Sequence, residues 1–577
     1  MRLIYVQAAL PPRRAPRSRA SSGGRRVSSG SARASGANRP ILRIALLFLV
    51  LLTTVAAAAA CTGSPAASPL ARLRPCTSDE GPVDAYCGSL EVLENPQAAA
   101  GRRIPLNIVV LPSLSGERAD PLFFLAGGPG QAAAQLAPQV REIFRRVLRD
   151  RDVVLVDQRG TGKSNPLNCR SSANTLREAM ESDEQSLARL KTCLAGYDAD
   201  VRYYTTSIAM DDLDAVRAHL GYEHVNLYGG SYGTRAALVY LRRHGERVRS
   251  MILDGVAPTD MRLPLFAARD AQRALDKLLA ACDADAPCRA AQPDLALRVR
   301  ALLARLEANP ARVRLMHPRT GAAEEVVMEA RIVATIIFGA LYNPLTASLV
   351  PALLTRAEEN DFQGLVALGF ANDGADENMS VGMQLSVICS EDAPRVSAED
   401  LARQGAGTIF GGYLLSGQVK ACAMWPRGDV EPSYYEPVVS DVPALVLSGD
   451  VDPVTPPEWG EAVTRHLKNA RHIIVPATGH GVIATACGQQ LVQQFIDTAS
   501  VTDLDTSCVS TVRRPPFFLT PAGPDPNPKS QTPNPKSQGT NEAAGSAGRE
   551  SETGSGGPSG PPWSSHRRGA VRATSAR

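Results

Sequence analysis

The chain has 577 residues, with 62 Lys or Arg against 58 Asp or Glu, and 44% of its residues are hydrophobic. This composition supplies a large core and excludes a wholly disordered or collagen-like chain. The formal net charge of +4 does not indicate a nucleic-acid partner, because residues 1–60 hold ten Arg and no acidic residue, and residues 521–577 hold seven basic and four acidic ones. The part between them carries a net charge of −9.

The first predicted element is an uncharged stretch, Ile44–Ala60, which is rich in Leu and then Ala and follows Arg43. Its 17 residues are short for a membrane-spanning helix. Residues 1–60 therefore read as a secretory leader, with an uncleaved transmembrane anchor as the alternative. The sequence Ala58-Ala59-Ala60-Cys61 is similar to the lipobox of bacterial lipoproteins, apart from Ala58, where Leu is usual. We expect an exported bacterial protein that is secreted or anchored at the cell envelope by a lipid on Cys61.

Short apolar runs then alternate with helical patterns, which is typical of a parallel sheet covered by helices on both faces. Residues 89–112 predict an antiparallel hairpin. The remaining expected elements are strands at 122–125, 153–156, 225–228, 251–253, 444–447 and 473–475, and helices at 211–220 and 461–467. Between 260 and 442 this rhythm breaks, and the sequence is mainly helical. We predict one α/β domain, formed by residues 61–259 and 443–515, that is interrupted by a helical cap at 260–442.

The last segment, residues 516–577, is predicted to be a disordered tail. From residue 521 onward it is rich in Pro, Gly and Ser, and it contains a tandem repeat, Pro526-Asn527-Pro528-Lys529-Ser530-Gln531 and Pro533-Asn534-Pro535-Lys536-Ser537-Gln538. Such a segment cannot bury a core.

The cysteine content also favours export. Of the 11 Cys residues, ten remain when Cys61 is set aside, and an even number is what disulfides in an oxidising compartment require. The simplest arrangement joins neighbours in sequence, although the sequence does not fix the connectivity: Cys76–Cys87, Cys169–Cys193, Cys282–Cys288, Cys389–Cys422 and Cys487–Cys508. No Cys-x-x-Cys pair or His cluster indicates a zinc site.

The most informative motif is Gly229-Gly230-Ser231-Tyr232-Gly233, which lies between a predicted strand and a predicted helix. In that context G-x-S-x-G forms a sharp turn that lifts a Ser hydroxyl clear of the sheet. The helix that follows favours developing negative charge at its N-terminus. Ser231 is therefore the candidate nucleophile.

A serine nucleophile needs a base, and the base needs an orienting carboxylate. Two candidates follow predicted strands, where sites form in open α/β sheets: Asp452 after 444–447 and His480 after 473–475. Asp450 is the competing acid. The other seven His residues have no comparable setting.

A glycine-rich loop, Gly127-Gly128-Pro129-Gly130, supplies backbone N–H groups that can approach a substrate oxygen closely. We assign the oxyanion donors to the amides of Gly128 and Tyr232, with Gly127 as the less certain candidate. The segment Gly160-Thr161-Gly162-Lys163-Ser164 is not a phosphate-binding loop, because Asp157 stands where that motif requires Gly. We expect Asp157 and Arg159 to brace the oxyanion loop.

Four segments together resemble the exported tripeptidyl aminopeptidases, which belong with the prolyl aminopeptidases in the α/β-hydrolase superfamily: Ala-Gly-Gly-Pro-Gly, Asp-Gln-Arg-Gly-Thr-Gly-Lys-Ser, Gly-Gly-Ser-Tyr-Gly-Thr and Gly-Asp-Val-Asp-Pro-Val-Thr-Pro. The resemblance covers roughly residues 75–515. It implies the α/β-hydrolase fold, a mostly parallel sheet with helices on both faces and a helical cap. One departure is Ala126, where relatives usually have His.

The resemblance also implies that acidic cap residues hold the free amino terminus of a peptide, and Glu391 is the best candidate, a solvated carboxylate being the alternative. The expected activity is that of a serine aminopeptidase that needs neither cofactor nor metal. Two alternatives stay open. One is an esterase with the same triad, and the other is a catalytically silent lipoprotein that only binds peptides.

Overall fold

The computed structural model describes residues 69–524, apart from residues 79–80, 82, 117–119, 170–174, 373–378 and 521–522. Its main sheet has nine strands: β1 (Arg74–Thr77), β2 (Asp84–Leu93), β3 (Arg103–Leu111), β4 (Leu122–Leu125), β5 (Val153–Val156), β6 (Val225–Gly230), β7 (Val248–Asp254), β10 (Ala444–Gly449) and β11 (Ala470–Val475). Every predicted strand of the α/β part is present, and the predicted hairpin is the antiparallel pair β2–β3.

The strand order is β1-β2-β3-β5-β4-β6-β7-β10-β11. The first three strands and β5 pair in antiparallel fashion, whereas the pairs from β5 to β11 are all parallel. Because parallel strands share a direction, β4, β6, β7, β10 and β11 all end at one edge of the sheet. The candidate catalytic segments follow these strand ends and are therefore brought together there.

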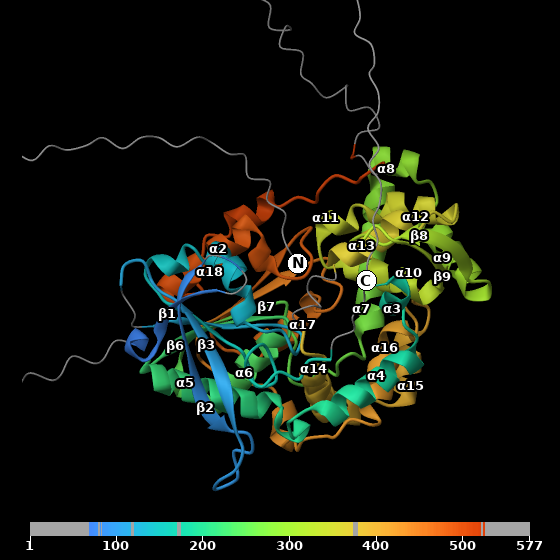
Figure 1. Cartoon of the computed structure of the whole chain (residues 1–577). Helices are drawn as coiled ribbons and strands as arrows, with labels where there is room; N and C mark the ends of the chain where they lie inside the picture. The colour runs from blue at the N-terminus through green and yellow to red at the C-terminus, as the bar shows by residue number, and fades with distance from the viewer. Residues whose placement is uncertain are drawn as a thin grey trace, which may run out of the picture. The chain divides into compact units, whose positions relative to one another are not determined.

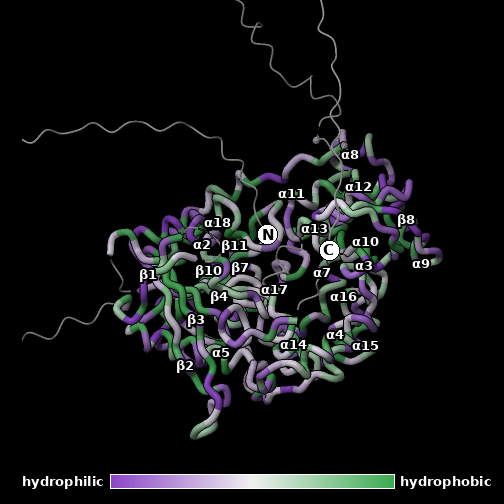
Figure 2. Tube along the Cα trace, in the orientation of Figure 1, coloured by the Kyte–Doolittle hydropathy of each residue, from purple (hydrophilic) through white to green (hydrophobic). Residues whose placement is uncertain are grey.

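Hydrophobic side chains of the sheet form two cores, one on each face. In β5, Val154 and Val156 belong to one core, and Val153 and Leu155 belong to the other. This alternation follows from the pleat, and a strand buried on both faces needs an unbroken apolar run. Figure 2 shows such hydrophobic runs along the strands, for example along β3. The first core is covered by α5 (Thr206–Leu220), α6 (Tyr232–His244) and α17 (Pro457–Thr464), and the second by α2 (Ala137–Ile143) and α18 (Ala486–Thr498).

The predicted cap lies between β7 and β10. It contains α7 (Ala267–Ala284), α8 (Ala286–Ala291), α9 (Leu295–Ala308), α10 (Ala330–Leu341), α11 (Pro344–Ala347), α12 (Val350–Glu358), α13 (Gln363–Asn372), α14 (Val381–Val387), α15 (Ala398–Gly405) and α16 (Tyr413–Cys422). It also contains an antiparallel hairpin that was not predicted, β8 (Ala311–Met316) with β9 (Ala323–Met328). A third hydrophobic core fills this region.

Two segments from outside residues 260–442 also pack on the cap. The first holds α3 (Leu176–Ala179) and α4 (Asp183–Gly196): the Leu176 amide binds the Glu324 carboxylate of β9, and α4 lies beside α16 (Figure 1). The second follows α18, where Phe517 is 2% exposed in the cap core and the Phe518 amide binds the Ser348 carbonyl at 3.1 Å. The predicted tail boundary at residue 516 therefore differs from the structure, because the chain there returns to bury an aromatic side chain.

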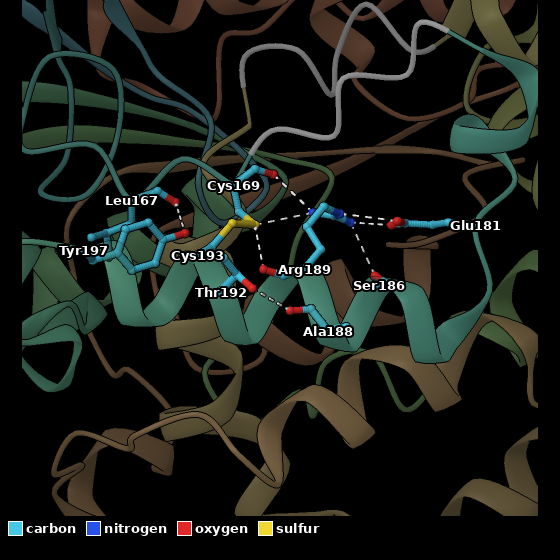
Figure 3. Close-up of a disulfide and its surroundings, with 9 residues drawn as sticks. All are labelled: Leu167, Cys169, Glu181, Ser186, Ala188, Arg189, Thr192, Cys193 and Tyr197. Carbon is cyan, nitrogen blue, oxygen red and sulfur yellow. Dashed lines mark hydrogen bonds and ion pairs between the residues drawn. A yellow bond between two sulfur atoms is a disulfide. The ribbon is translucent and has the colours of Figure 1, made fainter.

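Five disulfides join neighbours in sequence and confirm the predicted pairing: Cys76–Cys87, Cys169–Cys193, Cys282–Cys288, Cys389–Cys422 and Cys487–Cys508. Figure 3 shows Cys169–Cys193, which ties α4 to the loop after β5. Arg189 of α4 donates to the Cys169 carbonyl at 3.3 Å and pairs with Glu181. These bonds fix α4, and with it one side of the cap.

Within the described residues, no helix is both long and apolar enough to cross a membrane. The predicted leader at 1–60, the candidate lipid acceptor Cys61 and the repeats of the tail lie outside these residues.

Candidate active site

Ser231 occupies the turn between β6 and α6, with a backbone φ of 57° and ψ of −125°. A positive φ costs a non-glycine residue about 1–3 kcal/mol, so this turn has to be held by its surroundings. The flanking glycines allow that. A Cβ on Gly229 would lie 2.3 Å from the Gly233 carbonyl oxygen, and a Cβ on Gly233 would lie 2.1 Å from the Leu125 carbonyl oxygen. Strand β6 and helix α6 therefore lie closer to their neighbours than residues with a Cβ at these two positions would permit.

Asp452 and His480 form a hydrogen-bonded pair at the ends of β10 and β11. The Asp452 Oδ2 atom lies 2.8 Å from His480 Nδ1 and also accepts the Thr455 hydroxyl at 2.8 Å. Its Oδ1 atom accepts the amides of Val454 and Thr455, each at 2.9 Å. The carboxylate thus has a partner on every side, and these fix its orientation toward the imidazole.

The electrostatics of this pair suit a base that is oriented by an ionised carboxylate. Burial by itself would raise the pKa of Asp452, but the charge and hydrogen bond of His480 and the two backbone amides outweigh it and hold that pKa below 3.8. Burial lowers the pKa of His480, yet the charge and hydrogen bond of Asp452 and the charge of Asp254 bring it above 6.5. Asp450, the competing acid, instead lies 4.0 Å from Lys277.

His480 and Ser231 both lie against the end of β7. The Ser231 amide donates to the Asp254 carbonyl at 2.9 Å, and a Cβ on the next residue, Gly255, would lie 3.1 Å from His480 Cε1. The imidazole also meets the Tyr342 ring in an edge-to-face arrangement, at a centroid distance of 5.2 Å. Within the described residues no hydrogen bond joins Ser231 Oγ to His480 Nε2, which is common for a catalytic pair without bound substrate.

The glycine-rich loop packs directly on Ser231. A Cβ on Gly127 would lie 3.2 Å from Ser231 Cβ, and the Gly127 amide already donates to Gln131 Oε1 at 3.2 Å. Gly128 has a φ of 107°, and a Cβ there would lie 2.9 Å from Met379 Sδ. Because the Gly127 amide is engaged within the loop, the Gly128 amide is the better placed candidate donor.

Neither Asp157 nor Arg159 contacts the Gly127–Gly130 loop as expected: Asp157 binds the start of the short helix that follows this loop, and Arg159 lies farther away. Asp157 Oδ1 accepts the Ala134 amide at 2.8 Å, and its Oδ2 accepts the Asn107 side-chain amide at 2.8 Å. Arg159 is fully buried and instead pairs with Asp212 of α5 at 2.6 Å. Its remaining N–H groups donate to the carbonyls of Glu94, Tyr203 and Leu93, so the arginine holds α5 against the β2 end.

Glu391 lies in a π-helical turn, Ile388–Asp392, and is 1% exposed. Its carboxylate accepts the Thr206 amide at 2.6 Å, the Thr206 hydroxyl at 2.9 Å and the Tyr434 hydroxyl at 2.5 Å. Burial raises the pKa of this carboxyl group, although Arg235 at 3.9 Å opposes the shift. Glu391 is thus neither the solvated carboxylate of the alternative nor a carboxylate with an oxygen left open to a substrate amine.

Three residues near the site were not predicted, and two of them, Thr455 and Asp254, have a local sequence signal. Thr455 follows the acid by three residues and binds both members of the Asp452–His480 pair. Asp254 directly follows the apolar run of β7, just as Asp452 comes soon after the run of β10. Tyr342 had no such signal, because it reaches His480 from the cap. In the described part of the chain, no cluster of three or more His, Cys, Asp or Glu side chains is arranged to hold a metal ion.

Comparison with known proteins identifies the fold. Residues 120–321 match the family described as "alpha/beta hydrolase fold", and residues 407–508 match the family described as "TAP-like protein". The chain has the α/β-hydrolase fold. The order of its sheet and the position of Ser231 between β6 and α6 agree with that assignment.

Several curated relatives of this chain are named as peptidases. "Serine protease Hip1" of Mycobacterium tuberculosis is 28% identical over 434 residues, which are 70% of this chain and 82% of the relative. "Tripeptidyl aminopeptidase" of Streptomyces lividans is 27% identical over 30% of this chain and 36% of the relative, and "Proline iminopeptidase" of Neisseria gonorrhoeae is 30% identical over 24% and 32%. These relatives fit the group that the motifs resemble.

The raised pKa of His480 sets the expected pH dependence of activity. A base works only when it is unprotonated, so kcat/KM is expected to fall as the pH drops through the raised pKa of His480. A profile of kcat/KM against pH on a chromogenic peptide measures this limb. An acidic limb at a lower pH than that of an ordinary imidazole would contradict the assigned surroundings of His480.

Proposed function

We propose that this chain is an exported serine aminopeptidase that releases short peptides or single residues from the amino terminus of peptide substrates. The observation that carries the catalytic part is the convergence of three elements: Ser231 on its strained turn, the Asp452–His480 pair, and the Gly127–Gly130 loop packed on the serine. The exopeptidase part is supported by the names of two relatives, a tripeptidyl aminopeptidase and a proline iminopeptidase.

The chemistry follows from these positions. Ser231 Oγ attacks the scissile carbonyl carbon, and its proton passes to His480 Nε2 while Asp452 holds the Nδ1–H and stabilises the imidazolium. The amides of Gly128 and Tyr232 donate to the oxyanion. When the tetrahedral intermediate collapses, His480 returns the proton to the leaving amine and an acyl-enzyme remains. Water deprotonated by His480 then attacks the acyl carbon, and Ser231 regains its proton.

The five disulfides indicate an extracellular or cell-envelope protein, because such bonds persist in oxidising compartments. We propose further that the leader directs export and that Cys61 carries a lipid. We do not assign Glu391 as the amine-binding group, since its carboxylate is occupied by Thr206 and Tyr434.

Blocking the amino terminus of a substrate tests the exopeptidase proposal. We expect an unblocked chromogenic peptide to be cleaved at least ~100-fold more efficiently than its N-acetylated counterpart, because loss of a buried charged contact costs about 3 kcal/mol. The measurement is kcat/KM on the matched pair, with product masses from a peptide ladder giving the number of residues released. Equal rates on both peptides would refute amine recognition, and faster cleavage of acyl esters would favour the esterase alternative.

A further inference from the structure

Asp254 is the last residue of β7, the strand between the nucleophile strand β6 and the acid strand β10. It is 1% exposed and is not a member of the proposed triad. Its backbone carbonyl accepts the amide of Ser231 at 2.9 Å, and it stands opposite Gly230 in the β6–β7 register. The backbone of the strained serine turn is therefore fastened to Asp254.

The carboxylate of the same residue fastens the loop that follows His480. Its Oδ1 atom accepts the Val482 amide at 2.8 Å, and its Oδ2 atom accepts the Ile483 amide at 2.8 Å and the Tyr228 hydroxyl at 2.9 Å. The two amides belong to residues 482 and 483, which come two and three positions after His480. Asp254 thus contacts the loop after His480, strand β6 through Tyr228, and the turn that holds Ser231.

Gly255, the residue after Asp254, lies directly beside the His480 imidazole. Gly255 has a φ of +70°, and a Cβ there would lie 3.1 Å from His480 Cε1, 3.3 Å from His480 Nδ1 and 3.0 Å from Thr455 Oγ1. No side chain separates the imidazole from the end of β7. A shift of Asp254 would therefore move His480 relative to Ser231.

Asp254 also differs from other buried acids in its partners. The three groups that donate to its carboxylate are all neutral, and the described residues form no ion pair with it, whereas Asp212 and Asp392 are paired with Arg159 and Arg235. Burial raises the pKa of Asp254, and the two amides, the Tyr228 hydroxyl and the nearby charge of His480 oppose that shift.

Among the described residues, three elements place a group against His480: Asp452 comes from the β10 loop, Asp254 from β7, and the neutral ring of Tyr342 from the cap. Arg273 of α7 donates to the backbone carbonyls of Asp450 and Asp452, each at 3.3 Å. Both carboxylates favour the protonated imidazole. That is the form in which His480 exists while Ser231 attacks.

We propose that Asp254 is a positioning residue that holds the His480 loop in register with Ser231 and supplies a second negative charge for the imidazolium. The inference rests on the proposed triad. It assigns Asp254 no contact with substrate, and it predicts an effect on the chemical step rather than on substrate binding.

The test uses labelling of the full-length enzyme by a fluorophosphonate, in which Ser231 Oγ displaces fluoride from phosphorus and its proton passes to His480. We expect Asp254→Asn to lower the labelling rate constant about 10- to 100-fold, because a displaced base costs that much. We also expect the acidic limb of the rate profile to move to lower pH, since loss of the negative charge lowers the pKa of His480. On a peptide substrate kcat should fall and KM should stay unchanged.

Asp152→Asn is the matched control. Asp152 is 0% exposed and binds the same kinds of donor, the Ser113 amide at 2.7 Å and the Tyr222 hydroxyl at 2.8 Å, but it precedes β5 at the opposite edge of the sheet. The Asp152→Asn variant should have a lower thermal stability, but the acidic limb of its rate profile should not move. If Asp254→Asn does not fold, Tyr228→Phe, which removes one donor that orients the carboxylate, should lower the labelling rate constant in the same direction by less, and an unchanged rate overturns the positioning role.

The outcomes are distinct. Wild-type enzyme that does not react at Ser231 refutes the proposed triad itself. Wild-type enzyme that reacts, with an Asp254→Asn variant of unchanged rate or unchanged acidic limb, overturns the role of Asp254 and leaves the triad standing. A limb that moves equally in Asp152→Asn also overturns it.

Discussion

Replacing Ser231 by Ala is expected to reduce kcat by about 10⁵- to 10⁶-fold while the fold and its disulfides remain intact, because the covalent path is lost and only binding and the oxyanion donors persist. The turn tolerates the change, since Ala keeps the Cβ of Ser231 and removes only the hydroxyl group. The measurement is kcat on an unblocked peptide together with a thermal melt. Turnover equal to the wild type would eliminate Ser231 as the nucleophile.

A second serine provides the control for this experiment. Ser448 of β10 also bonds a histidine, with 2.9 Å between its Oγ and His472 Nε2, but it is 0% exposed and cannot meet a substrate. Ser448→Ala should therefore keep kcat within a few-fold of the wild type. Comparing the two variants separates a catalytic Ser–His relationship from a structural one.

Replacing Asp452 by Asn is expected to lower kcat about 10⁴-fold, because the amide would offer a donor to His480 Nδ1 and favour the wrong tautomer. The oxygen of the Asn side chain can still accept the amides of Val454 and Thr455, as Oδ1 does now, but its NH2 group then takes the place of Oδ2 opposite the Thr455 hydroxyl and His480 Nδ1. Enzyme kinetics at saturating peptide and a pH profile are the readouts.

Asp450→Asn is the matched variant for that prediction. The Asp450 side chain is 33% exposed and lies 4.0 Å from Lys277, so its charge contributes little to His480. We expect kcat within a few-fold of the wild type. A larger loss in Asp450→Asn than in Asp452→Asn would mean that the acid has been assigned to the wrong residue.

The sequence located the parts of the site that depend on local patterns. Apolar runs marked the strands, and because parallel strands end at one edge, Ser231, Asp452 and His480 could be expected to lie together before any coordinates were known. The disulfide pairing followed from the short separations between neighbouring Cys residues, of which the longest is 33.

What could not be predicted depends on contacts between distant segments. Glu391 reads as a polar residue in Cys-Ser-Glu-Asp, and only the fold brings Thr206 and Tyr434 to its carboxylate. Arg159 stands in the same motif as Asp157, yet it turns to Asp212 on α5. Phe517 follows two Pro residues next to a low-complexity tail, and nothing local indicates that the cap receives it.

Three separate segments of the chain connect the α/β part to the cap, and these connections constrain how a peptide can enter. A cap formed by one insertion could swing as a lid about two adjacent hinges. Here α3 and α4, the insertion itself and the segment around Phe517 all join the cap, and disulfides fasten α4 and the start of the last segment. Rotation about a single axis would have to strain or release all of them together. Entry should therefore rely on local side-chain and loop movements, which admit a thread-like chain end more readily than a folded domain.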